Sequence, residues 1–297
     1  KLVDEGKVAW TTPVSKIYPE FRLGDSATTA KVEFRHLACM CTGIPSGDLE
    51  WILGMDRKTD PAATFRMLAS TQPTAEFGEV AQYNNAIVAA AGFIAGHLVH
   101  PELPLVQAYS RAMQEKVFGP LGMMSTTFDL ERVLARHHAM PHGLDREGRP
   151  APGLYIGDYP AMSPAGSAWS DARDMARYVS NELSLGRSRD GRALFSKTNL
   201  LFRRQNGLPF MDGSRYALGL ITKDHGGIEV VGHRGGTPGF ISMFSVIPQA
   251  RIGAVLLTNS EQGGPLIEGF ERRLIEVVYG AEPKAAAEVA AAAARAT

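Results

Sequence analysis

Two short stretches of the chain combine side chains that can carry out acid–base chemistry. The first is "GEVAQYNNA", in which Tyr83 and Asn85 stand two residues apart, directly before a long apolar run. A phenol and an amide from one loop can converge on a pocket, and Tyr83 can shuttle a proton if a nearby cation lowers its pKa. The same residues also fit a tyrosine packed at a helix start beside an asparagine that caps the helix.

The second stretch is "GHRGGTPGF", in which His233 and Arg234 precede Gly235 and Gly236. It lies between apolar segments typical of buried strands. Glycines remove side chains from a strand at an edge and leave backbone N–H groups open to a ligand. A free N–H beside a cationic residue is the arrangement that an oxyanion hole needs. The alternative is a core histidine whose hydrogen bonds are satisfied internally.

The elements that must position these residues change in type along the chain. After about residue 214, the segments "RYALGLIT", "GIEVVGH", "FISMFSVIP" and "RIGAVLLTN" are short, rich in β-branched and aromatic residues, and separated by turn residues. Connections this short require antiparallel neighbours, because a parallel crossover needs a dozen or more residues. "GGPLIEGFERRLIEVVYG" then has the pattern of an amphipathic helix that covers a sheet face.

The middle of the chain is mainly helical and rich in loops. "SPAGSAWSDARDMARYVSNELSLG", for example, predicts a helix capped by Ser170 or Asp171. We therefore predict an α+β fold, with an antiparallel sheet flanked by helices and a mainly helical region inserted in the chain. One domain should span residues 1–280, with the helical region at about 31–200 and the sheet and its covering helix at about 201–280. The Ala-rich segment 281–297 is expected to be a tail or linker.

Composition excludes several classes of function. Lysine plus arginine equals aspartate plus glutamate at 31 each, so no overall charge favours nucleic acid or an anionic membrane. No apolar run reaches the ~18–20 residues of a membrane span.

A metal hydrolase built on "RHHAMPH", with His137, His138 and His142, is an alternative, but the spacing is loose and lacks an acidic partner. We expect a surface loop there, and neither metal nor cofactor.

The two cysteines, Cys39 and Cys41 in "LACMCTGIP", are separated by a single residue. Residues this close do not easily close a disulfide with sound geometry. They also lack the wider spacing and second ligand pair of a zinc site. We therefore expect two buried, unreactive thiols and no disulfide framework.

Four segments together resemble the serine β-lactamase and penicillin-binding-protein superfamily. They are "YNN" before an apolar helix, "VFGPLGMMSTTF", "SPAGSAWSDARDMARY" and "GHRGGTPGFISMFSVIPQARIGAVLLTN". The resemblance is greatest to the class C β-lactamase-like serine hydrolases, which include esterases and D-amino-acid peptidases. It covers about residues 1–280, and the block from His233 to Asn259 is its most specific part. The family uses three ordered motifs: Ser-x-x-Lys, Tyr-x-Asn, and Lys-Thr-Gly or a variant such as His-x-Gly.

The resemblance implies roles for individual residues. Tyr83 matches the tyrosine that acts in proton transfer, and Asn85 matches the amide that positions the lysine of the first motif and the acyl amide of the substrate. His233 stands where the third motif has its lysine, and Gly236 falls where the family supplies one oxyanion-hole N–H. We expect the remaining residues of the third motif to bind substrate: Arg234, Gly235 and Thr237.

The first of the three motifs is missing. None of the nine lysines has a serine three residues before it, and Thr28 with Lys31 lies in a polar stretch downstream of the expected place. In the family, the Ser-x-x-Lys helix runs directly into a segment like "LVDEGKV". The resemblance thus implies an N-terminally truncated chain, inactive alone, whose nucleophile and first sheet strands lie upstream of Lys1. Any signal peptide would lie there too, and relatives are often exported to the periplasm or secreted.

The resemblance implies a serine hydrolase that acts through an acyl-enzyme on a small-molecule ester, amide or peptide. In β-lactamases, a lysine and a hydroxyl residue of the third motif face the substrate carboxylate, where this chain has His233 and Arg234. A neutral imidazole anchors a carboxylate less well, so we expect ester or small amide and peptide hydrolysis rather than efficient β-lactam turnover. The alternatives are a true β-lactamase and a non-catalytic protein that binds peptidoglycan-like or acylated ligands.

Overall fold

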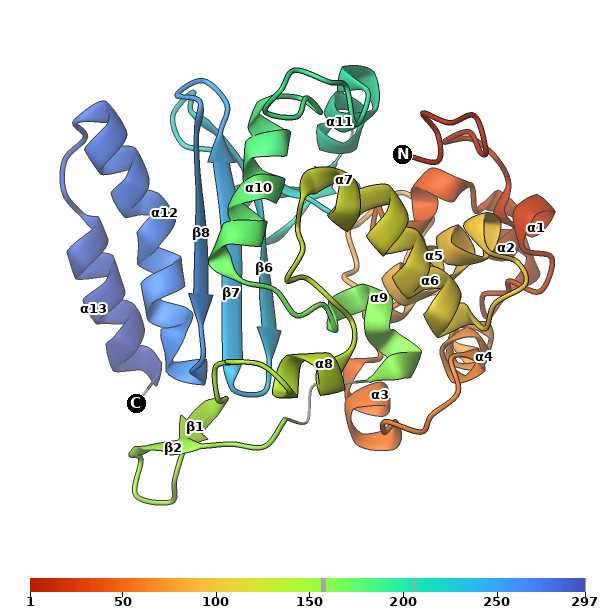
Figure 1. Cartoon of the computed structure of the whole chain (residues 1–297), viewed down its shortest axis with the longest axis horizontal. Coiled ribbons are helices and arrows are strands. Elements are labelled where there is room, and N and C mark those ends of the chain that lie inside the picture. Colours follow the sequence, from red (N-terminus) through yellow and green to blue (C-terminus); the bar gives the residue numbers. More distant parts are fainter. Residues whose placement is uncertain (156–158, 206, 297) are drawn as a thin grey trace.

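The computed structural model describes residues 1–155, 159–205 and 207–296, and it places a sheet region beside a helical region (Figure 1). Within the described residues, the main sheet has six strands in the order β3-β4-β5-β6-β7-β8, and each pairs antiparallel with its neighbour, as predicted. Its strands are β3 (Leu208–Pro209), β4 (Arg215–Tyr216), β5 (Ile221–Asp224), β6 (Glu229–Thr237), β7 (Phe240–Ile247) and β8 (Ile252–Thr258). A separate hairpin joins β1 (His142–Leu144) and β2 (Pro150–Pro152).

Strand β6 is longer than its neighbour β5. It pairs with β7 as far as Thr237, opposite Phe240, but with β5 only from Glu229 to Gly232. The stretch 233–237 therefore has a strand on one side only. This is the stretch that carries the histidine and the paired glycines.

Helices cover both faces of the sheet because side chains alternate along each strand. Val231 and Val246 pack with Val179 of α10 (Ala172–Leu183) on one face. Val230 and Ile247 pack with Ile275 of α12 (Gly264–Tyr279) on the other face. The sheet is thus the middle layer of three in this part of the molecule (Figure 1).

The Ala-rich C-terminal segment forms helix α13 (Ala285–Ala296), which lies along α12. The buried carboxylate of Glu276 accepts hydrogen bonds from the backbone N–H groups of Lys284 and Ala285, at 2.6 and 2.8 Å. It thereby satisfies free N–H groups at the start of α13, as a capping residue does. The described part of the segment expected to be a tail or linker is thus helical and contacts α12, and Thr297 lies outside the described residues.

The helical region is built around α5 (Asn85–Val99), the apolar helix that follows Tyr83. Ile87, Phe93 and Ile94 of α5 are buried in the largest hydrophobic cluster of the described residues. The other helices of the region are α1 (Val14–Ile17), α2 (Ser26–Lys31), α3 (Asp48–Gly54), α4 (Ala62–Ser70), α6 (Leu105–Met113), α7 (Gly119–Leu121), α8 (Leu130–Leu134), α9 (Ser163–Gly166) and α11 (Lys197–Arg204).

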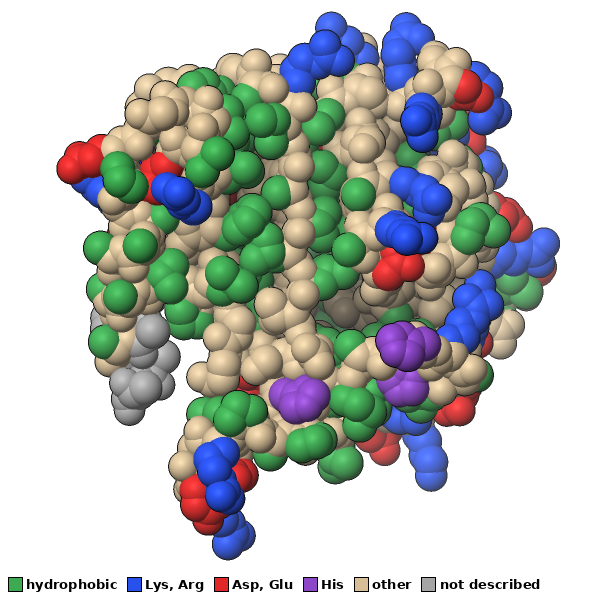
Figure 2. Space-filling view, turned by 60° about the vertical axis from the view of Figure 1, so that its left-hand side comes forward, with side chains coloured by type: hydrophobic (Ala, Val, Ile, Leu, Met, Phe, Trp, Pro, Cys, Tyr) green, Lys and Arg blue, Asp and Glu red, His purple; other side chains and the backbone are tan. Residues whose placement is uncertain are grey.

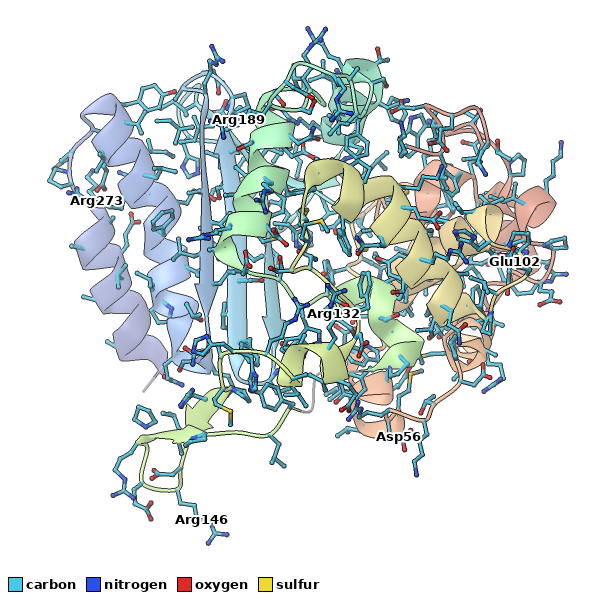
Figure 3. All side chains as sticks on the ribbon, viewed as in Figure 1. Asp56, Glu102, Arg132, Arg146, Arg189 and Arg273 are labelled. Atoms are coloured by element: carbon cyan, nitrogen blue, oxygen red, sulfur yellow. A yellow bond between two sulfur atoms is a disulfide. The ribbon has the colours of Figure 1, made fainter. Side chains whose placement is uncertain are left out.

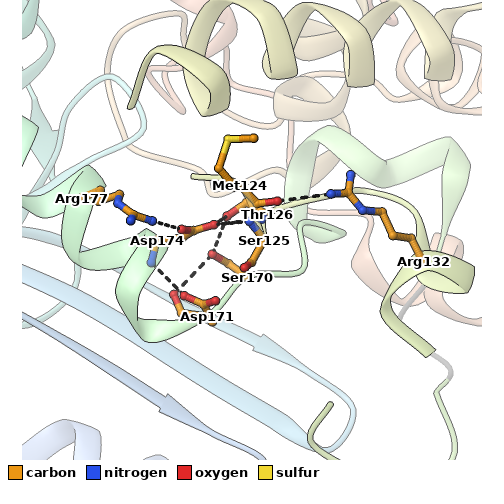
Figure 4. Close-up of polar contacts among 8 residues, drawn as sticks. All are labelled: Met124, Ser125, Thr126, Arg132, Ser170, Asp171, Asp174 and Arg177. Carbon is orange, nitrogen blue, oxygen red and sulfur yellow. Dashed lines mark hydrogen bonds and ion pairs between the residues drawn. The ribbon is translucent and has the colours of Figure 1, made fainter. Parts of the chain in front are cut away.

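Asp174 of α10 joins the helical region to the sheet layer (Figure 4). Its carboxylate is 1% exposed and accepts hydrogen bonds from the backbone N–H groups of Ser125 and Thr126 and from the Thr126 hydroxyl. Arg177 pairs with its other oxygen at 2.6 Å. Asp171 caps the same helix by accepting from the N–H of Asp174, as one of the two predicted capping residues. The segments "GMMST" and "SDARDMARY" therefore form one hydrogen-bonded joint.

Several charged side chains extend outward from the surface of the molecule. Asp56, Glu102 and Arg146 extend outward from the rim of the molecule (Figure 3). Hydrophobic and uncharged side chains cover much of the face formed by α12, β8 and α10 (Figure 2). Among the described helices, none combines the length and the apolar character needed to cross a bilayer.

The prediction of two free thiols was wrong, because Cys39 and Cys41 form a disulfide. Met40 between them adopts a left-handed backbone with φ of 55°, and the two Cα atoms lie 5.1 Å apart. That separation is within the range that a disulfide requires. The expectation failed because it assumed an ordinary backbone at the intervening residue.

Asp174→Ala should destabilise the chain by ~3 kcal/mol, because it removes the acceptor of the Ser125 and Thr126 backbone N–H groups and the ion-pair partner of Arg177. Urea unfolding of the purified variant measures this change. Asp190→Ala is the matched control, since that side chain is 58% exposed and its partners lie within two residues. Equal free energies of unfolding for the two variants would show that the joint does not stabilise the fold.

Candidate active site

The structure brings Tyr83 and His233 together across the boundary between the helical region and the sheet. Their ring centroids are 6.3 Å apart. Tyr216 of β4 packs edge-on against both rings, with centroids 5.7 Å from Tyr83 and 5.8 Å from His233. Phe210 adds a fourth ring against the two tyrosines. The two sequence-predicted side chains thus share one aromatic cluster.

Both ring nitrogens of His233 have partners. Nδ1 lies 2.6 Å from the carbonyl oxygen of Arg234 and must donate, because a carbonyl oxygen only accepts. Nε2 lies 3.2 Å from the Tyr216 hydroxyl, which donates to it when the ring is neutral. Burial lowers the pKa of His233 below its ordinary value, although the hydrogen bond to Arg234 opposes this. At neutral pH the third motif therefore presents an uncharged imidazole.

Asn85 is held by an acidic side chain. Its Nδ2 donates to both carboxylate oxygens of Asp48 in α3, at 3.0 and 3.2 Å. The helix cap is its neighbour Asn84, whose side chain accepts from the N–H of Ile87. Burial and the negative charge of Asp48 raise the pKa of Tyr83. Within this chain Tyr83 is therefore a protonated phenol, and only an added cation would make it a base.

The glycines of "GHRGGTPGF" serve different purposes. A Cβ on Gly232 would lie 2.2 Å from the carbonyl oxygen of Phe244, so glycine allows β6 and β7 to approach each other. Gly239 has φ of +80° in the turn between these strands. A Cβ on Gly236 would meet only the tip of Ile241, at 4.0 Å. Internal packing therefore does not require glycine at 236, and an alanine would fit there.

The register of the hairpin fixes where the Gly236 N–H points. The two-residue turn closes on Thr237 opposite Phe240, so Thr237 exchanges its hydrogen bonds with β7. The backbone groups of Gly236 must then point the other way, toward the edge that β5 does not reach. Gly236 thus directs an N–H into the open side of β6, three residues from His233.

The other third-motif residues lie beside this edge. Gly235 and Arg234 are exposed, and Thr237 is half-buried. Arg234 follows His233 along the strand and therefore projects from the opposite face, as strand alternation predicts. The aromatic cluster and the arginine side chain are consequently on different faces of β6.

The histidine-rich stretch forms no metal centre in the structure. Within residues 1–155, 159–205 and 207–296, no three side chains of His, Cys, Asp or Glu are placed to hold a metal ion. His138 and His142 instead bond through Nδ1 to nearby backbone carbonyl oxygens. The potential Thr28 nucleophile lies on α2, where it contributes its N–H to the Asp25 cap.

Two residues of the site could not be recognised in the sequence. Tyr216 stands in "SRYALGLIT", where a tyrosine is ordinary for a strand, and Asp48 stands in "SGDLEW", where an aspartate is ordinary for a helix start. Their contacts to His233 and Asn85 span 17 and 37 residues of sequence. Only the folded chain relates them to the site.

The chain is similar in sequence to known proteins of one family. The family profile described as Beta-lactamase matches residues 1–276. The chain belongs to the β-lactamase family. Penicillin-binding protein 4 from Amycolatopsis lactamdurans is 27% identical over 291 residues, covering 94% of this chain and 73% of that protein. An unguisins hydrolase from Aspergillus campestris is 26% identical over 275 residues, covering 87% of this chain and 49% of that protein.

Solved structures confirm the β-lactamase-like α+β fold. The octameric penicillin-binding protein homologue from Pyrococcus abyssi has a TM-score of 0.77 at 25% identity, over 95% of this chain and 63% of that one. The D-amino acid amidase from Ochrobactrum anthropi SV3 has a TM-score of 0.67 at 22% identity, over 87% of this chain and 71% of that one. The chain thus spans about half of the unguisins hydrolase and less than two thirds of the archaeal homologue.

The neutral state of His233 predicts a pH dependence for this β-lactamase-family chain. Because the folded pKa is lowered, the unfolded chain binds more protons as pH falls below about 6.5. The stabilisation is therefore present above the unfolded pKa and is lost as pH falls through the folded pKa. Urea unfolding between about pH 5 and pH 7.5 should show a smaller decrease for His233→Gln than for the unsubstituted chain.

His36, whose pKa burial also lowers, contributes equally to both proteins and so cancels in that comparison. If the two proteins lose stability in parallel, His233 is not held neutral by the fold.

Proposed function

We propose that this chain forms part of a serine hydrolase that acts through an acyl-enzyme on ester or small amide and peptide substrates. The observation that supports it is the contact of the Tyr83 ring with a neutral His233 on β6, next to the stretch of that strand that β5 does not pair with. This edge offers the backbone N–H of Gly236 to a carbonyl oxygen. The named relatives include a hydrolase and an amidase, which agrees with this class of reaction.

The charges of the site residues determine which group carries out each step of the proposed reaction. A serine hydroxyl attacks the substrate carbonyl, its proton passes to a lysine–tyrosine pair that includes Tyr83, and Gly236 donates to the oxyanion. Tyr83 has a raised pKa in this chain, so it needs a cation such as the lysine of Ser-x-x-Lys beside it to act as a base. The tetrahedral intermediate then expels the alcohol or amine of the substrate, which takes the proton from the lysine–tyrosine pair, and the acyl-enzyme remains. Water hydrolyses the acyl-enzyme, which releases the acid and regenerates the serine.

The chain contains no Ser-x-x-Lys and is therefore proposed to be inactive alone. Loss of the nucleophile from a serine hydrolase lowers turnover on the order of 10⁶-fold. A fluorophosphonate probe should label the complete gene product and leave this chain unlabelled. Absence of labelling in both would favour a ligand-binding protein that has the fold without the reaction.

The substrate preference follows from the third motif. His233 is uncharged and Arg234 projects from the opposite face, so no cation from these two positions faces the aromatic cluster. A substrate carboxylate, as in a penicillin or cephalosporin, would lack its usual partner. The complete gene product should hydrolyse a p-nitrophenyl ester faster than a cephalosporin. Faster cephalosporin turnover would instead identify a true β-lactamase.

The oxyanion role of Gly236 has its own test in the complete gene product. Gly236→Pro removes the N–H on the open side of β6, where no ladder hydrogen bond is lost. Turnover of the ester should fall roughly 100-fold, the effect of deleting one oxyanion donor. Steady-state kinetics measures this, with circular dichroism as the check that the variant is folded.

Gly236→Ala is the matched control, because it keeps the N–H and its Cβ meets only Ile241 at 4.0 Å. It should retain most of the ester turnover. A folded proline variant with undiminished turnover would exclude Gly236 as the oxyanion donor.

A further inference from the structure

The only two cysteines of the chain close a three-residue ring beneath the loop that carries Tyr83. The carbonyl oxygen of Met40, inside the ring, accepts from the N–H of Gln82 at 2.8 Å. The Met40 sulfur lies 3.1 Å from the N–H of Asn84. The backbone on both sides of Tyr83 is therefore attached to the residue that the disulfide encloses.

The ring is attached to the loop at a further point and to the sheet as well. The carbonyl oxygen of Cys41 accepts from Gly78 at 2.8 Å. The carbonyl oxygen of Ala38, which precedes the ring, accepts from Gly219 at 2.9 Å. Gly219 lies in the turn between β4 and β5, three residues after Tyr216. Both phenols that flank His233 are thus connected through short paths to the same ring.

The disulfide acts on local conformation more than on the stability of the whole domain. Loop-closure stabilisation grows with the length of the closed loop, and a loop of three residues is the short extreme. Met40 is buried and holds a left-handed backbone, which an unbranched side chain rarely adopts without constraint. Opening the ring would release that constraint directly beneath Tyr83.

We propose that Cys39–Cys41 is a redox modification site, reduced by a dithiol, that controls the conformation of the Tyr83 loop. A thiolate of the dithiol attacks the sulfur of Cys39, and the S–S bond breaks. Cys41 leaves as a thiolate and takes a proton. The second thiol of the reductant then attacks the mixed disulfide, and Cys39 leaves and is protonated. The chain gains two electrons and two protons, and the dithiol becomes a disulfide.

The first measurement establishes the bond. The purified chain is treated with oxidised glutathione, freed of it, denatured without reductant and titrated for thiols, and its intact mass is measured to show that no glutathione is bound. We expect no free thiol, and two free thiols per chain would overturn the proposal.

The second measurement follows the conformation. Hydrogen exchange of the folded chain is compared with and without dithiothreitol in peptides that contain Gly78, Gln82, Asn84 and Gly219. Reduction should speed exchange at these amides about tenfold, because the acceptors that hold them lose their fixed positions. Amides of β7 should be unaffected and serve as the internal control.

The double variant Cys39→Ser, Cys41→Ser provides the matched control. It should exchange rapidly at the same amides with or without dithiothreitol. Unchanged exchange on reduction of the unsubstituted chain would overturn the proposal, whatever the folding of the variant. Neither measurement requires hydrolysis, so the result stands apart from the proposed function.

Discussion

The difference in length between β5 and β6 is the constraint on which the candidate active site depends. Five residues of β6 continue past the last pair with β5, so their backbone groups face an open edge while β7 holds them in register. A strand paired on one side is rigid enough to position a ligand and still has free donors. If β5 continued alongside these residues, the Gly236 N–H would form a hydrogen bond within the sheet and would not be free to donate to a ligand.

The aromatic contact between Tyr83 and His233 joins this edge to the helical region. Tyr83 enters from the loop before α5, whereas His233 and Tyr216 come from the sheet. The rings bury one another in part, and burial acts in opposite directions on the pKa values of the histidine and the phenol. It lowers the pKa of the histidine and raises that of the phenol, so both rings are uncharged at neutral pH. The site can consequently form hydrogen bonds through these side chains and through the open edge of β6, and His233 carries no positive charge.

The charges around Tyr83 differ from those that a lysine in the third motif would give. β-Lactamase-family proteins share a fold and differ in the groups that face the substrate. In this chain, the acidic Asp48 behind Asn85 and the neutral His233 make the surroundings of Tyr83 less positive than a lysine in the third motif would. The lysine of a Ser-x-x-Lys segment would add a positive charge next to Tyr83.

The local sequence pattern was sufficient to predict the antiparallel sheet and the helices that cover it. The short turns and the β-branched segments after residue 214 predicted antiparallel strands. A cap at Ser170 or Asp171 and the amphipathic segment from Gly263 to Gly280 predicted helices, because each pattern depends only on neighbouring residues. The tertiary structure alone decided that Tyr216 bonds His233 and that Asp48 bonds Asn85, because these contacts join distant parts of the chain. It also decided the disulfide, which depends on one left-handed residue held by hydrogen bonds from the Tyr83 loop. Sequence pattern fixes which way a side chain faces within its element, but packing between elements determines what it meets.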